Sequence, residues 1–146
     1  MSGEDFADRF AAWWLRPDPD TLGDLLAADV VLRQPLTPDT RGLDAGRRSF
    51  RALLAFLPDL AATVDRSAAA GDGVLIEFTL RCTLGGRALA WRAVDRFELG
   101  DDGKALLRVS YFDPLPLLAA VIGRPRAWPA VARAGMRLAR DAKMPA

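Results

Sequence analysis

The sequence predicts an α+β fold: a curved antiparallel sheet wrapped by N-terminal helices and extended by a C-terminal helical tail. Apolar residues recur at helical spacing up to Pro58, alternate as in strands between residues 60 and 113, and return to helical spacing afterwards. A chain of 146 residues is long enough for one domain with a substantial core. We expect residues 1–115 to form the sheet domain and residues 116–146 to form a helical extension of it.

The composition excludes several kinds of chemistry. Histidine is absent, which rules out Ser-His-Asp and Cys-His nucleophiles and zinc sites that use histidine. No motif for a metal or an organic cofactor is present, so we expect none, and a net charge of +1 gives no argument for nucleic acid as a partner. A single cysteine, Cys82, an acidic N-terminus and the lack of any membrane-length apolar run lead us to expect a cytoplasmic protein.

Three helices are expected before the sheet. A capping-box pattern at Ser2 and Asp5 begins the first helix, which ends at Pro17. Asp18–Asp20 begins a second helix, and Asp44 is a plausible N-cap for the third. The apolar faces of these helices are expected to consist of Phe6, Phe10, Trp13, Trp14, Leu22, Leu25, Leu26, Phe50, Leu53, Leu54 and Leu57.

The strands are separated by residues that favour turns. Pro35 ends the first strand at Gln34, because proline cannot continue an interior ladder. Gly85-Gly86 and Asp102-Gly103 are typical of two-residue hairpin turns. The expected strands are Val30–Leu32, Leu60–Ala69, Val74–Leu84 and the two halves of Ala88–Asp113.

These two turns also predict how the last three strands pair. The Gly-Gly turn places Ile76 opposite Asp95, and the Asp-Gly turn places Asp95 opposite Ser110. Asp95 is therefore expected on an otherwise apolar face. The same turns predict the pairs Cys82–Leu89, Leu80–Trp91, Phe78–Ala93, Phe97–Arg108, Ala93–Phe112 and Arg92–Asp113.

The tail contains an apolar run, Leu117–Ile122, and a helix expected over Ala127–Ala142. Arginines at positions 133, 137 and 140 line one side of that helix. The helix either covers the sheet domain or its partner, or its arginines meet an anionic membrane surface or nucleic acid.

A resemblance follows from the motif Val94-Asp95-Arg96-Phe97 together with Gly103-Lys104 and Tyr111-Phe112-Asp113-Pro114. In this order of elements, residues 3–115 resemble the nuclear transport factor 2-like cone fold. That superfamily includes ketosteroid isomerases, limonene epoxide hydrolases and SnoaL-like polyketide cyclases. The resemblance implies a cone-shaped sheet around an interior pocket, while the superfamily also contains proteins without catalytic activity.

The resemblance does not extend to either complete set of catalytic residues. The ketosteroid isomerase pattern matches Asp95, but its general base corresponds to Gln34 and its tyrosine to Phe10, and an amide cannot abstract a proton. The epoxide hydrolase pattern fails where Thr79, Arg81 and Ser110 stand in place of its charged residues.

Two interpretations of Asp95 remain open at this stage. A carboxyl group is costly to ionise in an apolar cavity, so burial would favour the protonated form, which donates a hydrogen bond or a proton. Alternatively, Asp95 forms an ion pair with Arg108, diagonal to it on the same face, and stays charged and inert. Arg108 then either clamps an anionic or carbonyl-bearing ligand or only neutralises Asp95.

Three functional predictions result, and the third of them is attachment to a membrane surface through the basic tail. The first is a pocket protein for a small apolar or carbonyl-containing molecule, with Asp95 as acid or hydrogen-bond donor; if it is an enzyme, it is a cofactor-independent isomerase, cyclase or lyase. The second is a non-catalytic dimeric ligand carrier or interaction module, with the dimer formed through the polar outer face of the sheet. Pocket contacts are expected from Gln34, Arg108 and Ser110, and from an aromatic set that is otherwise plain core: Phe10, Trp14, Phe78, Trp91, Phe97 and Phe112.

Overall fold

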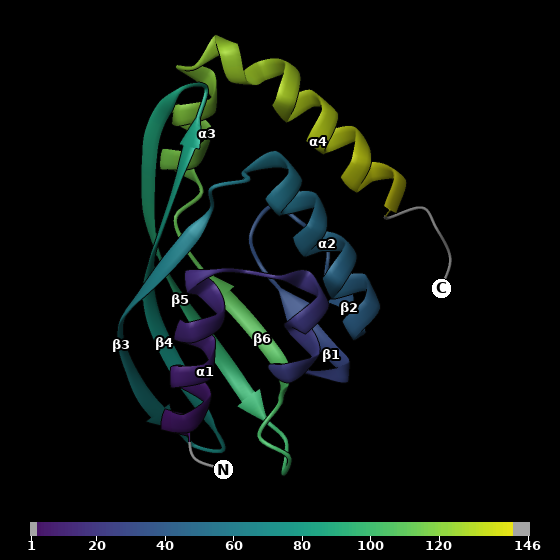
Figure 1. The fold of residues 1–146 in the computed structure, drawn as a ribbon, viewed down its shortest axis with the longest axis vertical. Helices are drawn as coiled ribbons and strands as arrows, with labels where there is room; N and C mark the ends of the chain where they lie inside the picture. Colours follow the sequence, from purple (N-terminus) through teal and green to yellow (C-terminus); the bar gives the residue numbers. More distant parts are fainter. Residues whose placement is uncertain (1–2, 142–146) are drawn as a thin grey trace.

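A computed structural model of the chain describes residues 3–141. Six strands form one curved sheet in the order β2-β1-β6-β5-β4-β3 (Figure 1). All neighbouring strands are antiparallel except β1 and β6, which run parallel. The strands are β1 (Leu26–Arg33), β2 (Thr40–Arg41), β3 (Ala61–Ala70), β4 (Gly73–Leu84), β5 (Arg87–Leu99) and β6 (Ala105–Tyr111).

The β4–β5 hairpin confirms the predicted register over its whole length. Ile76 pairs with Asp95, and the ladder closes with Leu84 opposite Arg87. Gly85 and Gly86 have φ values of 60° and 76°, which is the backbone that a two-residue type I′ turn requires and that glycine adopts without strain.

The β5–β6 pair has the predicted register but not the predicted turn. Asp95 pairs with Ser110 and Phe97 with Arg108. The connection is a longer loop in which Gly100 donates a hydrogen bond to the Lys104 carbonyl, and an irregularity after Glu98 restores the register. The predicted pairs Ala93–Phe112 and Arg92–Asp113 do not form, because β6 ends at Tyr111.

The N-terminal helices differ from prediction at their boundaries. Helix α1 (Gly3–Leu15) is confirmed, whereas the second helix is a short 3-10 helix, η1 (Pro19–Asp24), followed directly by β1. Helix α2 (Leu43–Phe56) begins after Gly42, whose φ of 86° suits glycine. Asp44 lies within its first turn and pairs with Arg47, so the expected N-cap at Asp44 is wrong by two residues.

Helices cover one face of the sheet and extend beyond one end. Helix α1 packs against β3 and β4, and α2 packs against β1 and η1. The core lies between these helices and the sheet. The tail forms α3 (Leu115–Ile122), η2 (Pro125–Ala127) and α4 (Trp128–Asp141); α4 lies against α2 at the upper end of Figure 1. The predicted end of the last helix, Ala142, lies outside the described residues.

Candidate functional site

Asp95 and Arg108 form a buried ion pair in the middle of the sheet. Their strands are neighbours, and because Asp95 pairs with Ser110 and Phe97 with Arg108, the two charged side chains are diagonal on the same face. The Nε atom of Arg108 lies 2.5 Å from Oδ2 of Asp95. The Asp95 side chain is 0% exposed and Arg108 is buried. Of the two interpretations of Asp95 from the sequence, the geometry favours the ion pair.

The pair leaves a polar atom without a partner. Oδ1 of Asp95 is buried and has no hydrogen-bond partner among the described residues. On the Arg108 side, the guanidinium carbon lies 6.0 Å from the centre of the Phe50 ring. A buried ion pair costs desolvation energy that only full hydrogen bonding offsets. The pair is incompletely hydrogen-bonded, so its burial costs free energy that the packing of the apolar core does not require.

Arg108 borders a small cavity. Its volume is about 20 Å³, which is room for one water molecule. Apolar side chains from α1, η1, α2 and two strands surround it, and Arg108 is the one charged residue that the described part of the chain contributes to the lining. The lining residues are Phe6, Phe10, Trp13, Trp14, Leu22, Leu25, Leu26, Phe50, Phe97 and Arg108.

Aromatic rings fill most of the remaining interior. The Phe10 ring lies 5.3 Å from Phe78 and 5.4 Å from Phe97, centre to centre. Trp14 lies 6.2 Å from Phe10 and is also close to Phe50. These edge-to-face contacts are favourable in themselves, so the interior is a packed core around a small residual cavity.

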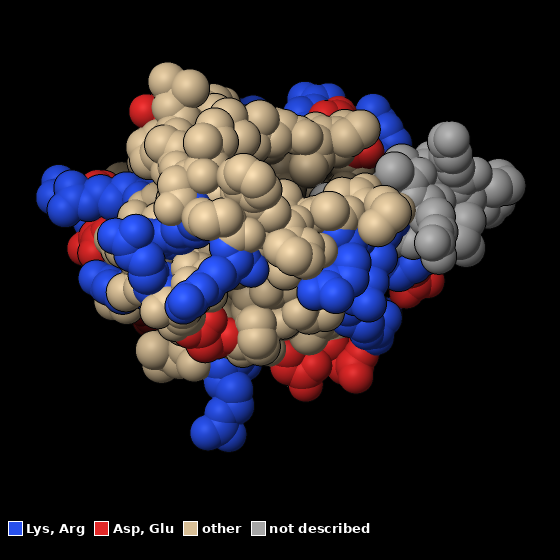
Figure 2. All heavy atoms as spheres, turned by 90° about the horizontal axis from the view of Figure 1, so that it is seen from above, with Lys and Arg blue, Asp and Glu red and all other residues tan. Residues whose placement is uncertain are grey.

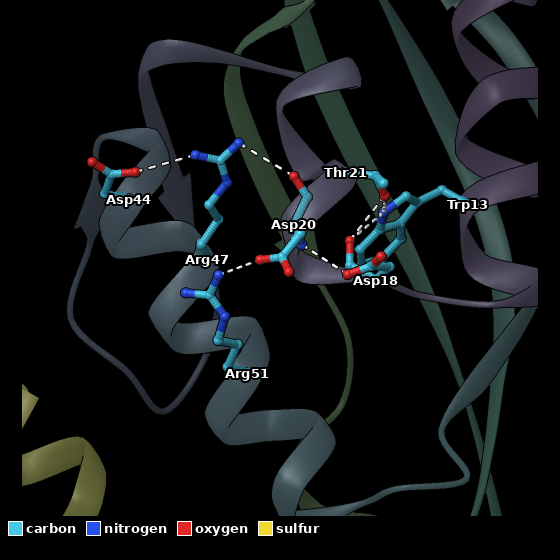
Figure 3. Close-up of polar contacts among 7 residues, drawn as sticks. All are labelled: Trp13, Asp18, Asp20, Thr21, Asp44, Arg47 and Arg51. Carbon is cyan, nitrogen blue, oxygen red and sulfur yellow. Dashed lines mark hydrogen bonds and ion pairs between the residues drawn. The ribbon is translucent and has the colours of Figure 1, made fainter.

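A polar network links η1 to α1 and α2 near the cavity-lining Trp13 (Figure 3). Trp13 Nε1 donates hydrogen bonds to the Asp18 carbonyl and to Thr21 Oγ1, both at 3.1 Å. Arg47 reaches the Asp20 carbonyl at 3.3 Å, and Arg51 forms an ion pair with the Asp20 carboxylate. The network fastens η1 to α1 and α2, and η1 in turn places Leu22 over the cavity.

The structure brings some of the predicted site residues together and separates others. Phe10, Trp14, Phe97 and Arg108 line the cavity. Ser110 and Phe78 are buried beside it but are not part of its lining, and Trp91 and Phe112 are half-buried against the edge of the core. Gln34 is exposed just after the end of β1, so its side chain is outside the cavity.

Sequence reasoning placed Trp13 and Phe50 on apolar helix faces but did not assign them to a site. Both face the cavity, and Phe50 also faces Arg108. The helical spacing of Phe6, Phe10 and Trp13 was the available indication that α1 forms one wall.

Other ionisable groups of note lie outside the cavity. Hydrogen bonds from Thr83 hold the pKa of Asp59 below its ordinary value, and burial raises the pKa of the Cys82 thiol. A hydrogen bond to Glu98 raises the pKa of Arg96. Within residues 3–141, no group of three or more Cys, Asp or Glu side chains is placed to hold a metal ion.

Comparison with known families gives one match. Residues 7–107 match the model of the SnoaL-like domain, which covers more than half of the chain. A search of curated proteins gives no match.

Solved structures share the fold at low identity. A candidate SnoaL-like polyketide cyclase from Jannaschia sp. CCS1 is 15% identical with a TM-score of 0.71, over 82% of this chain and 90% of its own. IdmH, a candidate polyketide cyclase from Streptomyces antibioticus, is 22% identical with a TM-score of 0.71, over 82% and 97%. TerC, co-crystallised with polyporic acid, is 18% identical with a TM-score of 0.71, over 80% and 95%.

Proposed function

The chain belongs to the SnoaL-like family, and from this premise we propose that it binds a small, mostly apolar molecule with a carbonyl or carboxylate oxygen inside its cone. The observation that carries the proposal is Arg108, a buried guanidinium at the edge of an otherwise apolar cavity. The crystallisation of the related TerC with polyporic acid adds support for a small-molecule site in this fold.

Arg108 is suited to recognise an oxygen atom. Asp95 holds its Nε, and the terminal Nη1 and Nη2 would be the donors for a ligand. A charge-assisted hydrogen bond from a guanidinium to an oxygen in a dry site is strong, because little water competes for it. An apolar ligand body would pack against the rings of Phe10 and Phe97.

In this proposal Asp95 positions Arg108. Its carboxylate accepts a hydrogen bond from Nε of Arg108 and so fixes the direction of the guanidinium. If the protein is an enzyme, an isomerase, cyclase or lyase reaction would rely on Arg108 to polarise a carbonyl. Asp95 would contact a substrate only after the ligand had broken the ion pair.

Entry of a ligand requires the cover of the cavity to move, since about 20 Å³ holds no more than a water molecule. Trp13 and η1 form this cover, and exposed polar contacts hold it. Exposed ion pairs contribute little to stability, so we propose displacement of η1 as the route to Arg108.

The test compares two probes with the same ring system, 2-naphthoic acid and naphthalene, of which only the first has a carboxylate. Binding is followed by isothermal calorimetry with the wild-type protein and with the double variant Asp95→Leu/Arg108→Met, which replaces the ion pair by apolar side chains. We expect wild type to bind 2-naphthoic acid at least about tenfold more tightly than naphthalene, because one charged hydrogen bond is worth about 1.5–3 kcal/mol. The double variant should lose this preference.

The variant Arg33→Met is the matched control, since Arg33 is an exposed arginine on neighbouring β1. It should keep the wild-type preference. Equal binding of the two probes by wild type, or an unchanged preference in the double variant, would contradict the role of Arg108.

One observation favours a second function, a non-catalytic interaction module. The interior is nearly filled by its own side chains, as such a module requires. We propose that its dimer would form through the outer sheet face, where Val94 pairs with Tyr111 and both are exposed. Failure of both probes to bind, together with a dimer in sedimentation that Tyr111→Glu dissociates, would favour this function.

A further inference from the structure

The tail presents an apolar surface that nothing in the described chain covers. Helix α3 has the sequence LPLLAAVI, without a polar side chain, yet none of its residues is fully buried. Ile122 is 71% exposed and Leu115 is 68% exposed. Exposed apolar areas of this kind mark interaction sites in soluble domains.

Helix α4 extends this surface. Val131 packs against the core, while Trp128, Ala132 and Met136, at four-residue intervals, share a face that is turned to solvent. A helix on the surface of a domain normally turns its polar side outward. Here part of the apolar side of α4 is exposed, beside exposed Arg133.

The charged side chains of the tail segment itself have one sign. Residues 114–137 contain four arginines, at positions 124, 126, 133 and 137, and no Asp or Glu. Figure 2 views the molecule from this end and shows a broad uncharged area bordered on several sides by basic side chains, with some acidic side chains between them. Two copies of this surface would bring like charges together, so charge complementarity favours an anionic partner over a second copy of the chain.

A groove beside α3 adds a place for an anionic group. It has a volume of about 260 Å³ and is lined by Gly85, Gly86, Arg87 and residues 123–126. Arg124 donates from Nη2 to the Ala88 carbonyl at 3.1 Å, while its Nη1 is buried and has no hydrogen-bond partner among the described residues. Arg87 and Arg126, which also line the groove, are exposed.

We propose that the face formed by α3, η2 and α4 docks onto the surface of an anionic phospholipid membrane. Leu115, Leu118, Ile122 and Trp128 enter the boundary between headgroups and acyl chains, and the groove of Arg87, Arg124 and Arg126 receives a lipid phosphate. Within the described residues, no helix is long and apolar enough to cross a bilayer, so the contact is interfacial.

The test is co-sedimentation of the full chain with vesicles of phosphatidylcholine, alone or mixed with phosphatidylglycerol, at low and high salt. We expect binding to the mixed vesicles and weak binding to phosphatidylcholine alone, with the former lost at high salt. Arg126→Gln should lower the partition coefficient about fivefold, as expected for one basic residue near an anionic surface. Ile122→Ser should lower it as well, because it removes an apolar contact.

Arg41→Gln on β2 is the matched control, since Arg41 is also exposed but lies outside this face. It should bind like wild type. Three outcomes would overturn the proposal: no binding to mixed vesicles by folded protein, equal loss in Arg41→Gln and Arg126→Gln, or a dimer in sedimentation that Ile122→Ser dissociates while vesicles remain unbound.

Discussion

Two apolar regions of this protein differ in what lies above them. The region under α1, η1 and α2 is closed, and its Trp14 is 2% exposed. The region on α3 and α4 is open, and its Trp128 is 54% exposed. Both regions are rich in large apolar residues, so composition alone does not distinguish them. The difference comes from position: the sheet and helices enclose the first region, whereas the chain continues past the sheet to form the second.

The comparison predicts very different results for the same substitution. Trp14→Ala should lower the free energy of unfolding by about 3–5 kcal/mol, because it opens a large void among buried rings. Trp128→Ala should lower it by about 1 kcal/mol or less, since the ring is half-exposed and its one hydrogen bond, to the Val121 carbonyl, is solvent-accessible. Urea unfolding measures both. Equal losses would mean that the two regions are equally buried in solution.

The ion pair gives the next prediction, within the closed region. Arg108→Met should lower the free energy of unfolding by about 3–5 kcal/mol, because it leaves the Asp95 carboxylate buried without a partner. The double variant Asp95→Leu/Arg108→Met should be close to wild type or more stable, since it removes both charges.

A double variant as unstable as the single one would contradict this account of the pair. It would mean that Asp95 and Arg108 stabilise the core by more than their mutual attraction. A wild-type level of stability in the double variant would instead support retention of the pair for ligand binding rather than for folding.

Loss of an ion pair that holds η1 should change the local opening of η1 more than the free energy of unfolding of the protein. Arg51→Ala removes the ion pair to Asp20, which is exposed, and should cost about 1 kcal/mol or less. Hydrogen exchange at the Leu25 amide, which bonds to the Leu22 carbonyl, should nevertheless become faster because η1 opens more often. Arg48→Ala on the same helix, with no ion pair among the described residues, is the control. Unchanged exchange in Arg51→Ala would show that other contacts hold η1.

Much of the sheet follows from the sequence, because strand pairing depends on local rules. The Gly85-Gly86 turn sets the pairing of Ile76 with Asp95 through backbone geometry alone. The Asp102-Gly103 turn was wrong although its register was right, because a bulge compensates for a longer loop. Such compensation depends on contacts along both strands, and no short motif specifies it.

The site was less predictable than the sheet. The diagonal placement of Asp95 and Arg108 follows from the register, so the pair was anticipated as one of two alternatives. The exposure of Gln34 was not, because it depends on where β1 ends and how the loop leaves the sheet. The size of the cavity depends on how rings from four elements pack together, which spacing does not reveal.

The smallest predicted effect concerns the point where the two regions meet. Asp59 accepts a hydrogen bond from the Thr83 amide at 3.0 Å, near the end of β4. Beyond that end, a Cβ placed on Gly85 would lie 3.3 Å from the Cβ of Arg124, so the turn touches the tail between α3 and η2. The Asp59 contact therefore holds the loop after α2 against the end of β4 that adjoins the tail.

The pH dependence of this contact has a definite sign. Hydrogen bonds from Thr83 lower the pKa of Asp59 in the folded protein, so the unfolded chain binds the proton more readily. Asp59 thus contributes stability above the pKa of the unfolded chain, about 4, and this contribution is lost as the pH falls through the folded value. Asp59→Asn should unfold with a shallower loss of stability between pH 5 and pH 2 than wild type, measured by urea titration across about that range. Asp8→Asn, at an exposed position on α1, should follow the wild-type curve, and a wild-type slope in Asp59→Asn would mean that the Thr83 contact does not persist in solution.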